Sequence, residues 1–189
     1  MTAIDRARQG ARGRGRPLLI VAVAAASLLA VLGSSIAVGA GQSSIAAVRA
    51  ATAAYHDLAV AEAAGYGPFY ICTDHVTDGT MGQHYVKGAL VGDAAIDPLQ
   101  PEALVYEPKR DGGYKLVAIE YVVFADAWDA VNANPPSLFG RTFTLVQAGN
   151  RYGLPDFYEL HVWLWRPNPS GIFNDWNPSV SCRGMGDPA

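Results

Sequence analysis

Residues 1–40 constrain the fold most, because they divide the chain into an export segment and a remainder that has to fold elsewhere. Five arginines precede an apolar run from Leu18 to Leu32, and the small residues Val38-Gly39-Ala40 follow it. A basic region, an apolar core and a small-residue exit in this order are typical of a secretory signal peptide. We therefore expect residues 1–40 to be a signal peptide that is cleaved before Gly41.

An uncleaved membrane anchor is the alternative for this segment. Residues 18–40 are long enough to cross a bilayer, which takes roughly 20 residues. The arginines would stay on the cytoplasmic side in either case, so both interpretations export the rest of the chain. We expect a secreted protein or a membrane-anchored one facing outside, with membrane contact only through residues 18–40.

The remainder, residues 41–189, is acidic and has the size of a single domain. It keeps nine basic and 16 acidic residues, a net charge of −7. Because it lacks the basic patch that nucleic-acid phosphates attract, we expect no nucleic-acid partner. Its two cysteines, Cys72 and Cys182, predict a disulfide in an oxidising compartment. A chain of roughly 150 residues can bury one core, so we expect one domain over residues 41–189.

A helical pattern and then a series of extended patterns follow along this domain. Residues 43–64 contain neither proline nor glycine and predict one amphipathic helix, with Val48, Ala51, Tyr55, Leu58 and Glu62 at helical spacing. After Pro68, β-branched and aromatic runs separated by turn residues predict a mostly antiparallel sheet. The expected strands are 69–72, 83–87, 103–107, 115–124, 142–147 and 158–166. The expected fold class is α+β, with one helix packed on the sheet and one disulfide.

The strand expected over residues 115–124 contains an acidic residue among apolar neighbours. Alternation places Glu120 on the same face as Leu116, Ala118, Val122 and Phe124. The other face, with Val117, Ile119, Tyr121 and Val123, is equally apolar, so both faces should be buried. An ionised carboxylate in such surroundings is costly unless it is paired, hydrogen-bonded or bound to a metal. Glu120 therefore needs a partner.

His84 and His161 are the candidate partners of Glu120. His84 heads a strand just after Gly82, which permits close approach of another backbone, and His161 shares one face of the last strand with Trp163 and Trp165. Two imidazoles and one carboxylate suit iron, zinc or copper with open positions for a ligand. Three interpretations stay open: a hydrogen-bonded polar cluster in the core, a site for a divalent transition metal, and a pocket for an organic ligand.

Two other patterns are weaker indications of a functional site. A loose blue-copper order of ligands is formed by Cys72, His75 and Met81, but its cysteine has a disulfide partner. The aromatic residues of the tail are Trp163, Trp165 and Trp176. They either seal the core beneath a long loop, which we expect, or form a stacking surface for a sugar. The chain contains no nucleophile elbow, phosphate-binding loop or dinucleotide fingerprint.

Several strings are specific enough to suggest a family. They include Met81-Gly82-Gln83-His84-Tyr85, the run PEALVYE at residues 101–107, and LHVWLW followed by NPSG within residues 160–171. In these strings the chain resembles a family of small exported bacterial proteins from high-GC, actinobacterial-type genomes. The resemblance implies an exported α+β domain. It implies no activity and no catalytic residues.

We expect the protein to be an exported binding domain for a metal ion or a small molecule, with His84, Glu120 and His161 as the metal ligands. The cofactor, where there is one, is expected to be a divalent transition metal. A metal-dependent extracytoplasmic enzyme is the alternative. A structural or interaction domain of the cell envelope is the third class, and it predicts an exposed apolar patch instead of a cavity at these residues.

Overall fold

The computed structural model describes residues 45–185, which belong to one compact unit. The expected signal peptide lies outside the described residues, as does the expected start of the first helix at residue 43. Within residues 45–185 no helix combines the length and the apolar character that a membrane crossing requires.

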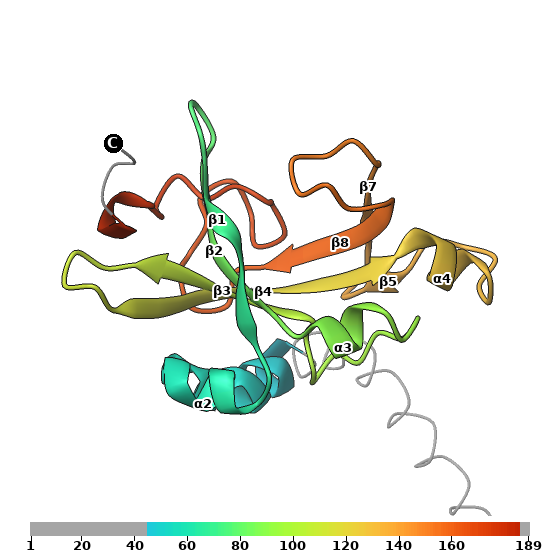
Figure 1. The fold of residues 1–189 in the computed structure, drawn as a ribbon, viewed down its shortest axis with the longest axis horizontal. Coiled ribbons are helices and arrows are strands. Elements are labelled where there is room, and N and C mark those ends of the chain that lie inside the picture. The colour runs from blue at the N-terminus through green and yellow to red at the C-terminus, as the bar shows by residue number, and fades with distance from the viewer. Residues whose placement is uncertain (1–44, 186–189) are drawn as a thin grey trace, which may run out of the picture. The chain divides into compact units, whose positions relative to one another are not determined.

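A six-stranded sheet forms the centre of the fold (Figure 1). Its strand order is β1-β2-β3-β4-β8-β7, and every neighbouring pair is antiparallel. These strands are β1 (Gly67–His75), β2 (Gly79–Val86), β3 (Ala103–Pro108), β4 (Tyr114–Phe124), β7 (Thr144–Val146) and β8 (Phe157–Val162). A separate pair is formed by β5 (Ser137–Leu138) and β6 (Arg141–Thr142). The predicted α+β class with a mostly antiparallel sheet is confirmed.

The single helix predicted over residues 43–64 is wrong in its continuity. Residues 45–52 are α-helical, a 3-10 turn η1 (Ala53–His56) follows, and a separate helix α2 (Leu58–Ala63) begins after Asp57. Asp57 adopts an extended backbone and its carboxylate accepts a hydrogen bond from the Ala59 N–H at 3.0 Å. Aspartate favours such a cap over a helix interior, which explains the break. The other helical elements are α3 (Gly88–Val91), α4 (Ala125–Asp129) and η2 (Arg183–Met185).

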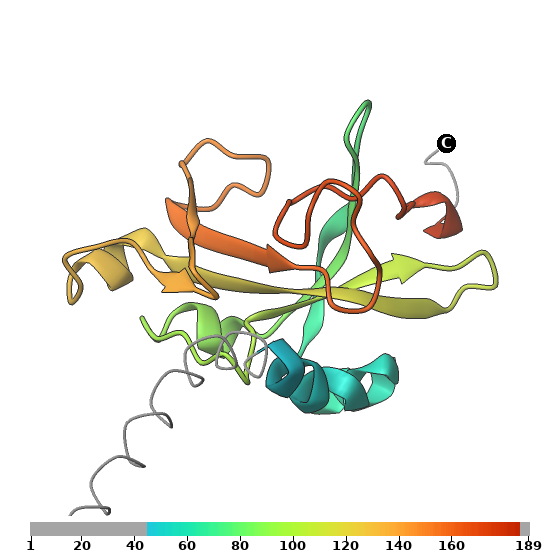
Figure 2. The same ribbon diagram turned by 180° about the vertical axis from the view of Figure 1, so that it is seen from behind.

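The sheet has a buried core on each of its faces. On the side of α2, strand residues such as Leu104 and Ile119 pack with Val48 and Ala61. Most of the segment that follows β8 lies on the other side of the sheet (Figures 1 and 2). There the buried cluster consists of Val105, Val117, Ala118, Trp163 and Val180. Strand β4 is therefore buried on both faces, as its sequence predicts.

A bulge alters which residues of β4 share a face. The pairing of β3 with β4 is irregular between Val105, which faces Ala118, and Tyr106, which faces Leu116. Leu116 consequently packs in the core on the α2 side with Ile119, and not with Ala118. The face predicted for Leu116 was wrong because strict alternation does not survive a bulge.

The last strand is shorter than predicted, since β8 ends at Val162 and not at Arg166. Trp163 remains on the expected face and is 3 % exposed, with its ring N–H donated to the Asn174 carbonyl at 2.6 Å. Trp165 instead turns toward the helical segment, where its ring centroid lies 4.4 Å from that of His56. For Trp163 the expected role in sealing the core is confirmed.

The predicted disulfide between Cys72 and Cys182 is confirmed, with Cα atoms 5.6 Å apart. It joins β1 to the end of the described chain, and a backbone bridge between Thr80 and the buried Asn177 holds the same segment. Closing a loop of this length contributes about 4 to 5 kcal/mol in the chain-entropy model. The bond fits an oxidising compartment, and it removes Cys72 as a copper ligand.

Candidate metal centre

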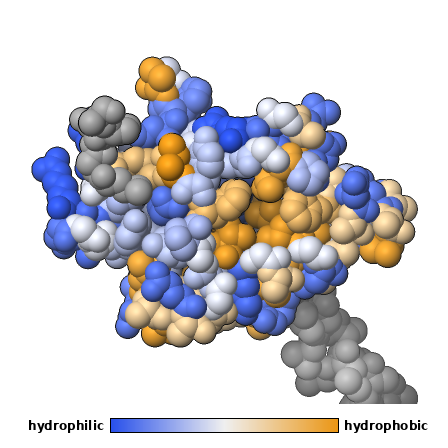
Figure 3. Space-filling model, viewed as in Figure 1, coloured by the Kyte–Doolittle hydropathy of each residue, from blue (hydrophilic) through white to orange (hydrophobic). Residues whose placement is uncertain are grey.

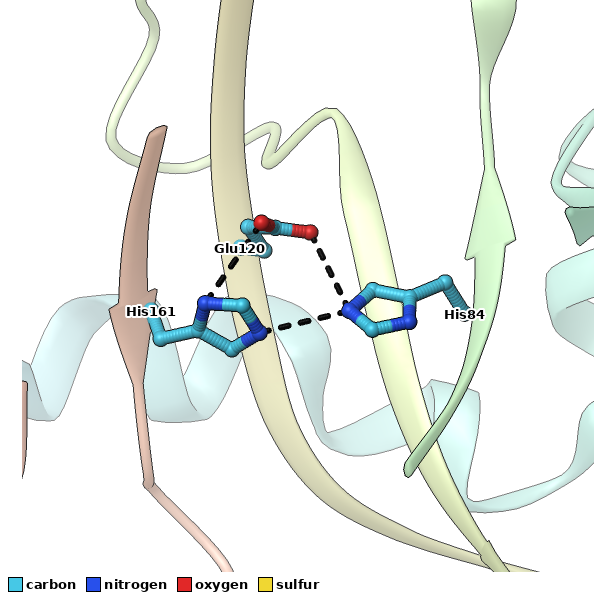
Figure 4. A group of neighbouring side chains, drawn as sticks. All are labelled: His84, Glu120 and His161. Carbon is cyan, nitrogen blue, oxygen red and sulfur yellow. Dashed lines mark hydrogen bonds and ion pairs between the residues drawn. The ribbon is translucent and has the colours of Figure 1, made fainter. Parts of the chain in front are cut away.

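Three strands bring His84, Glu120 and His161 together on one face of the sheet (Figure 4). Glu120 on β4 is the direct cross-strand partner of His161 on β8. Strand β3 separates β4 from β2 and places the small Ala103 opposite Glu120. The imidazole of His84 on β2 therefore reaches across β3 to the carboxylate.

Close packing of β2 on β3 assists this reach. Gly82 has a φ of +107°, and a Cβ at this position would lie 2.7 Å from Cγ1 of Val105. Only glycine allows both the backbone conformation and the short approach. The close approach predicted beside His84 is confirmed.

The three side chains form a compact, buried triangle. Nε2 of His84 lies 3.3 Å from Oε2 of Glu120 and 3.2 Å from Nε2 of His161. Nδ1 of His161 lies 3.4 Å from Oε1 of Glu120. All three residues are buried, and His161 is completely inaccessible. One ligand atom from each residue lies within 4.8 Å of the other two, so the group can hold a metal ion.

One nitrogen of this cluster lacks a hydrogen bond. Nδ1 of His161 is buried and has no hydrogen-bond partner among the described residues. The nearest carboxylates, Glu120 at 3.4 Å and Asp175 at 3.7 Å, are beyond good hydrogen-bond distance. Leaving such an atom unpaired costs about 1 to 3 kcal/mol. The arrangement is therefore incomplete as a purely hydrogen-bonded cluster.

Sequence reasoning missed two acidic residues that border the cluster. Glu159 and Asp175 form a second group with His161 whose ligand atoms also lie within 4.8 Å of one another. Glu159 precedes His161 by two positions on β8, so the period of a strand would have placed both on one face. Asp175 lies in the long segment after β8, where no pattern in the sequence indicates a direction.

The surroundings of the cluster shift the pKa values of the two imidazoles in opposite directions. Burial lowers the pKa of His161, but the carboxylates of Glu120, Asp175 and Glu159 outweigh this effect and raise it to about 9. Burial lowers the pKa of His84 to about 4, against the opposing influence of Glu120. Burial and the neighbouring Glu120 also raise the pKa of Glu159 well above its usual value. In the metal-free cluster His84 is thus held neutral, the form in which imidazole binds a metal, whereas His161 is held protonated and has to release a proton to bind one.

A cavity of about 220 Å³ opens beside the cluster. His84, Glu120 and Glu159 form its polar wall, whereas His161 does not reach it. The remaining wall is almost entirely apolar and includes Phe69, Val86, Val91, Val122, Leu154 and Phe157. Figure 3 shows a hydrophobic recess on this face of the molecule. A group in the cavity would therefore meet His84 and Glu120 at its polar end.

The fold and the cluster define the protein as a disulfide-closed α+β domain with a buried group of two histidines and one carboxylate. Comparisons with protein-family models, with curated proteins and with solved structures found no match. The function has to be inferred from the geometry of the site.

Proposed function

We propose that the protein is an exported binding domain that holds a divalent transition metal between His84, Glu120 and His161. The observation that carries the proposal is the spacing of the donor atoms, with Nε2 of His84 at 3.3 Å from Glu120 and 3.2 Å from His161. A tetrahedral ion with bonds of about 2.0 to 2.1 Å separates its ligand atoms by roughly 3.3 to 3.4 Å. These two donor separations already match the spacing that such an ion requires.

The surroundings of His161 also support a metal. With Nε2 of His161 on the ion, its Nδ1 would carry a proton and face Asp175, 3.7 Å away. A histidine that binds a metal through one nitrogen usually donates the other N–H to a carboxylate or a carbonyl. Asp175 is thus a positioning residue in this proposal, and its carboxylate has to approach Nδ1 from 3.7 Å to hydrogen-bond distance.

An extracytoplasmic location is part of the same proposal. The basic and apolar segment over residues 1–40 predicts export, and the disulfide fits an oxidising compartment. The strings around His84 and His161 that resemble exported proteins of high-GC bacteria agree with this location. We propose membership of that family together with the function.

Metal content is the test of the proposal. Protein purified from the exported fraction should carry about one metal ion per chain, and metal-free protein should take up Zn²⁺ after chelation. His84→Ala and His161→Ala should both lose the ion, because each removes one of only three protein ligands. His75→Ala is the matched control, since His75 is a surface histidine that pairs with Asp78 at 3.0 Å. Far-ultraviolet circular dichroism shows whether each variant is folded.

Two results would contradict the metal site. If wild-type protein contains no metal and takes up no Zn²⁺, the three residues form only a hydrogen-bonded polar cluster in the core. Equal uptake by the wild type and both cluster variants would place the bound ion elsewhere. The wild-type measurement decides the question even where a variant fails to fold.

A metal-dependent extracytoplasmic enzyme is a second candidate, and the cavity that borders His84 and Glu120 favours it. A catalytic metal keeps an open position for water or substrate, whereas a structural metal is enclosed by protein ligands. A purely structural envelope domain needs no such cavity. Hydrolysis of p-nitrophenyl acetate by Zn²⁺-loaded protein, compared with His84→Ala, tests the enzyme. Equal rates in the two proteins would count against it.

A further inference from the structure

We propose that the cavity beside the cluster binds a small, uncharged and mostly apolar molecule whose single nitrogen or oxygen donor completes the coordination of the metal. This inference rests on the proposed metal site and goes beyond it by naming the class of ligand. The cavity of about 220 Å³ exceeds the engineered cavity of about 150 Å³ that binds benzene. An aromatic ring with one further small group fits this space.

The direction of the open metal position follows from which ligands reach the cavity. His84 and Glu120 line it, whereas His161 is completely buried behind them. An ion held by all three residues therefore has protein on the His161 side and the cavity on the other. The position left for a fourth ligand therefore faces the cavity.

The charges at the polar wall favour an uncharged donor. Besides Glu120, the carboxyl group of Glu159 borders the cavity and is 5 % exposed. A carboxylate head group would be brought beside the carboxylate of Glu120, and an ammonium group would be brought beside the metal. Both encounters are costly in a site shielded from water. An alcohol, a phenol or an azole nitrogen avoids them.

The apolar wall is built by aromatic residues from different parts of the chain. The ring of Tyr152 packs against Phe69 at 5.8 Å, Tyr70 at 5.3 Å and Phe157 at 6.3 Å between centroids. Its hydroxyl is 3.5 Å from Sδ of Met81, which holds the ring in place. Such a wall stabilises an apolar ligand by about 25 cal/mol for each Å² that it buries.

Backbone strain marks the same edge of the cavity. Tyr70 has a φ of +57° within an irregular stretch of β1, next to the cavity residue Phe69. The buried amide of Gln83 donates to the carbonyls of Phe69 at 3.2 Å and Tyr70 at 3.3 Å, and so supports this conformation. A bulky residue with positive φ costs about 1 to 3 kcal/mol, and such strain is concentrated at ligand sites.

The test uses the exported protein loaded with Co²⁺, whose visible spectrum reports its coordination. The probes are 4-phenylimidazole, which has a donor and an apolar body, imidazole, which has the donor alone, and toluene, which has the body alone. Calorimetry should show 4-phenylimidazole binding at least about ten-fold more tightly than imidazole, because its ring is buried in the cavity. It should also change the Co²⁺ spectrum, which toluene should leave unchanged. Benzoate should bind more weakly than 4-phenylimidazole.

A substitution in the cavity wall separates this inference from the metal site. Leu154→Trp should fill the cavity from a loop position and reduce the advantage of 4-phenylimidazole over imidazole to within about two-fold, while the metal content stays unchanged. Leu145→Trp is the control, because Leu145 is exposed on β7 and does not line the cavity. It should bind the probe as the wild type does.

The contradicting outcomes are distinguishable. Wild-type protein without bound metal would overturn the proposed function together with the ligand. Retained metal with equal affinity for 4-phenylimidazole and imidazole, or a Leu154→Trp variant that binds the probe like the wild type, would overturn the ligand alone. Tighter binding of benzoate would overturn the uncharged head group.

Discussion

Replacing Glu102 by glutamine should make the stability of the protein less dependent on pH. Glu102 is 1 % exposed, and its Oε2 accepts a hydrogen bond from the Val122 N–H at 3.1 Å. Burial raises its pKa to about 8, with smaller contributions from Asp93 and Glu120, while backbone hydrogen bonds oppose the change. The unfolded chain ionises this group near its ordinary pKa of about 4.3. Between these two values the folded protein binds one proton more than the unfolded chain.

The sign of the effect follows from this difference. As the pH rises from about 5 to about 8, the free energy of unfolding contributed by Glu102 falls by up to about 1.4 kcal/mol per pH unit. The whole interval amounts to at most roughly 4 to 5 kcal/mol. Glutamine keeps an oxygen for the Val122 N–H and does not titrate. The stability of Glu102→Gln relative to the wild type should therefore increase steadily over this range.

Urea unfolding of metal-free protein, measured at several pH values between 5 and 8, tests this prediction. The quantity of interest is the slope of the stability difference with pH, because a constant offset reports only the altered hydrogen bonding of the amide. Glu107→Gln, on the same strand β3, is the control for the loss of one glutamate. A stability difference that does not change with pH would refute the reasoning.

Three further predictions concern the fold and the export segment. Gly82→Ala should destabilise the protein by more than about 1 kcal/mol in urea unfolding, because Gly82 has a positive φ and an added Cβ would lie too close to Val105. Gly88→Ala should have a much smaller effect, because the position of an added Cβ there is open space. Reduction of the disulfide should lower the free energy of unfolding by up to about 4 to 5 kcal/mol, and an unchanged unfolding midpoint in reductant would argue against its role. N-terminal sequencing of the exported protein should begin at Gly41, and an intact N-terminus would favour the membrane anchor.

The apolar patterns predicted much of the fold because they reflect burial directly. The run over residues 115–124 forms β4, and its two buried faces follow from apolar residues at nearly every position. The exceptions arise where a local hydrogen bond or an irregularity opposes the pattern. Asp57 caps a new helix inside an apparently continuous one, and the bulge in the pairing of β3 with β4 moves Leu116 to the other face.

The candidate site could be predicted only in part, because local sequence patterns do not determine which strands are neighbours in the sheet. A glutamate within an apolar strand indicated that Glu120 needs partners, and alternation placed His161 on a face of its strand. In the structure β8 pairs with β4, and this pairing places His161 directly opposite Glu120. The pairing depends on the topology of the whole sheet. Asp175 and the cavity depend on the path of long loops, which short-range patterns do not determine.

Anomalous diffraction at the zinc absorption edge, from crystals of the exported protein grown with Zn²⁺, tests the metal site most directly. The account predicts one strong peak between the three side chains, about 2.0 to 2.2 Å from an imidazole nitrogen of His84, a nitrogen of His161 and an oxygen of Glu120. A map with no peak there, and with His84 and His161 still in direct contact with Glu120, would contradict it.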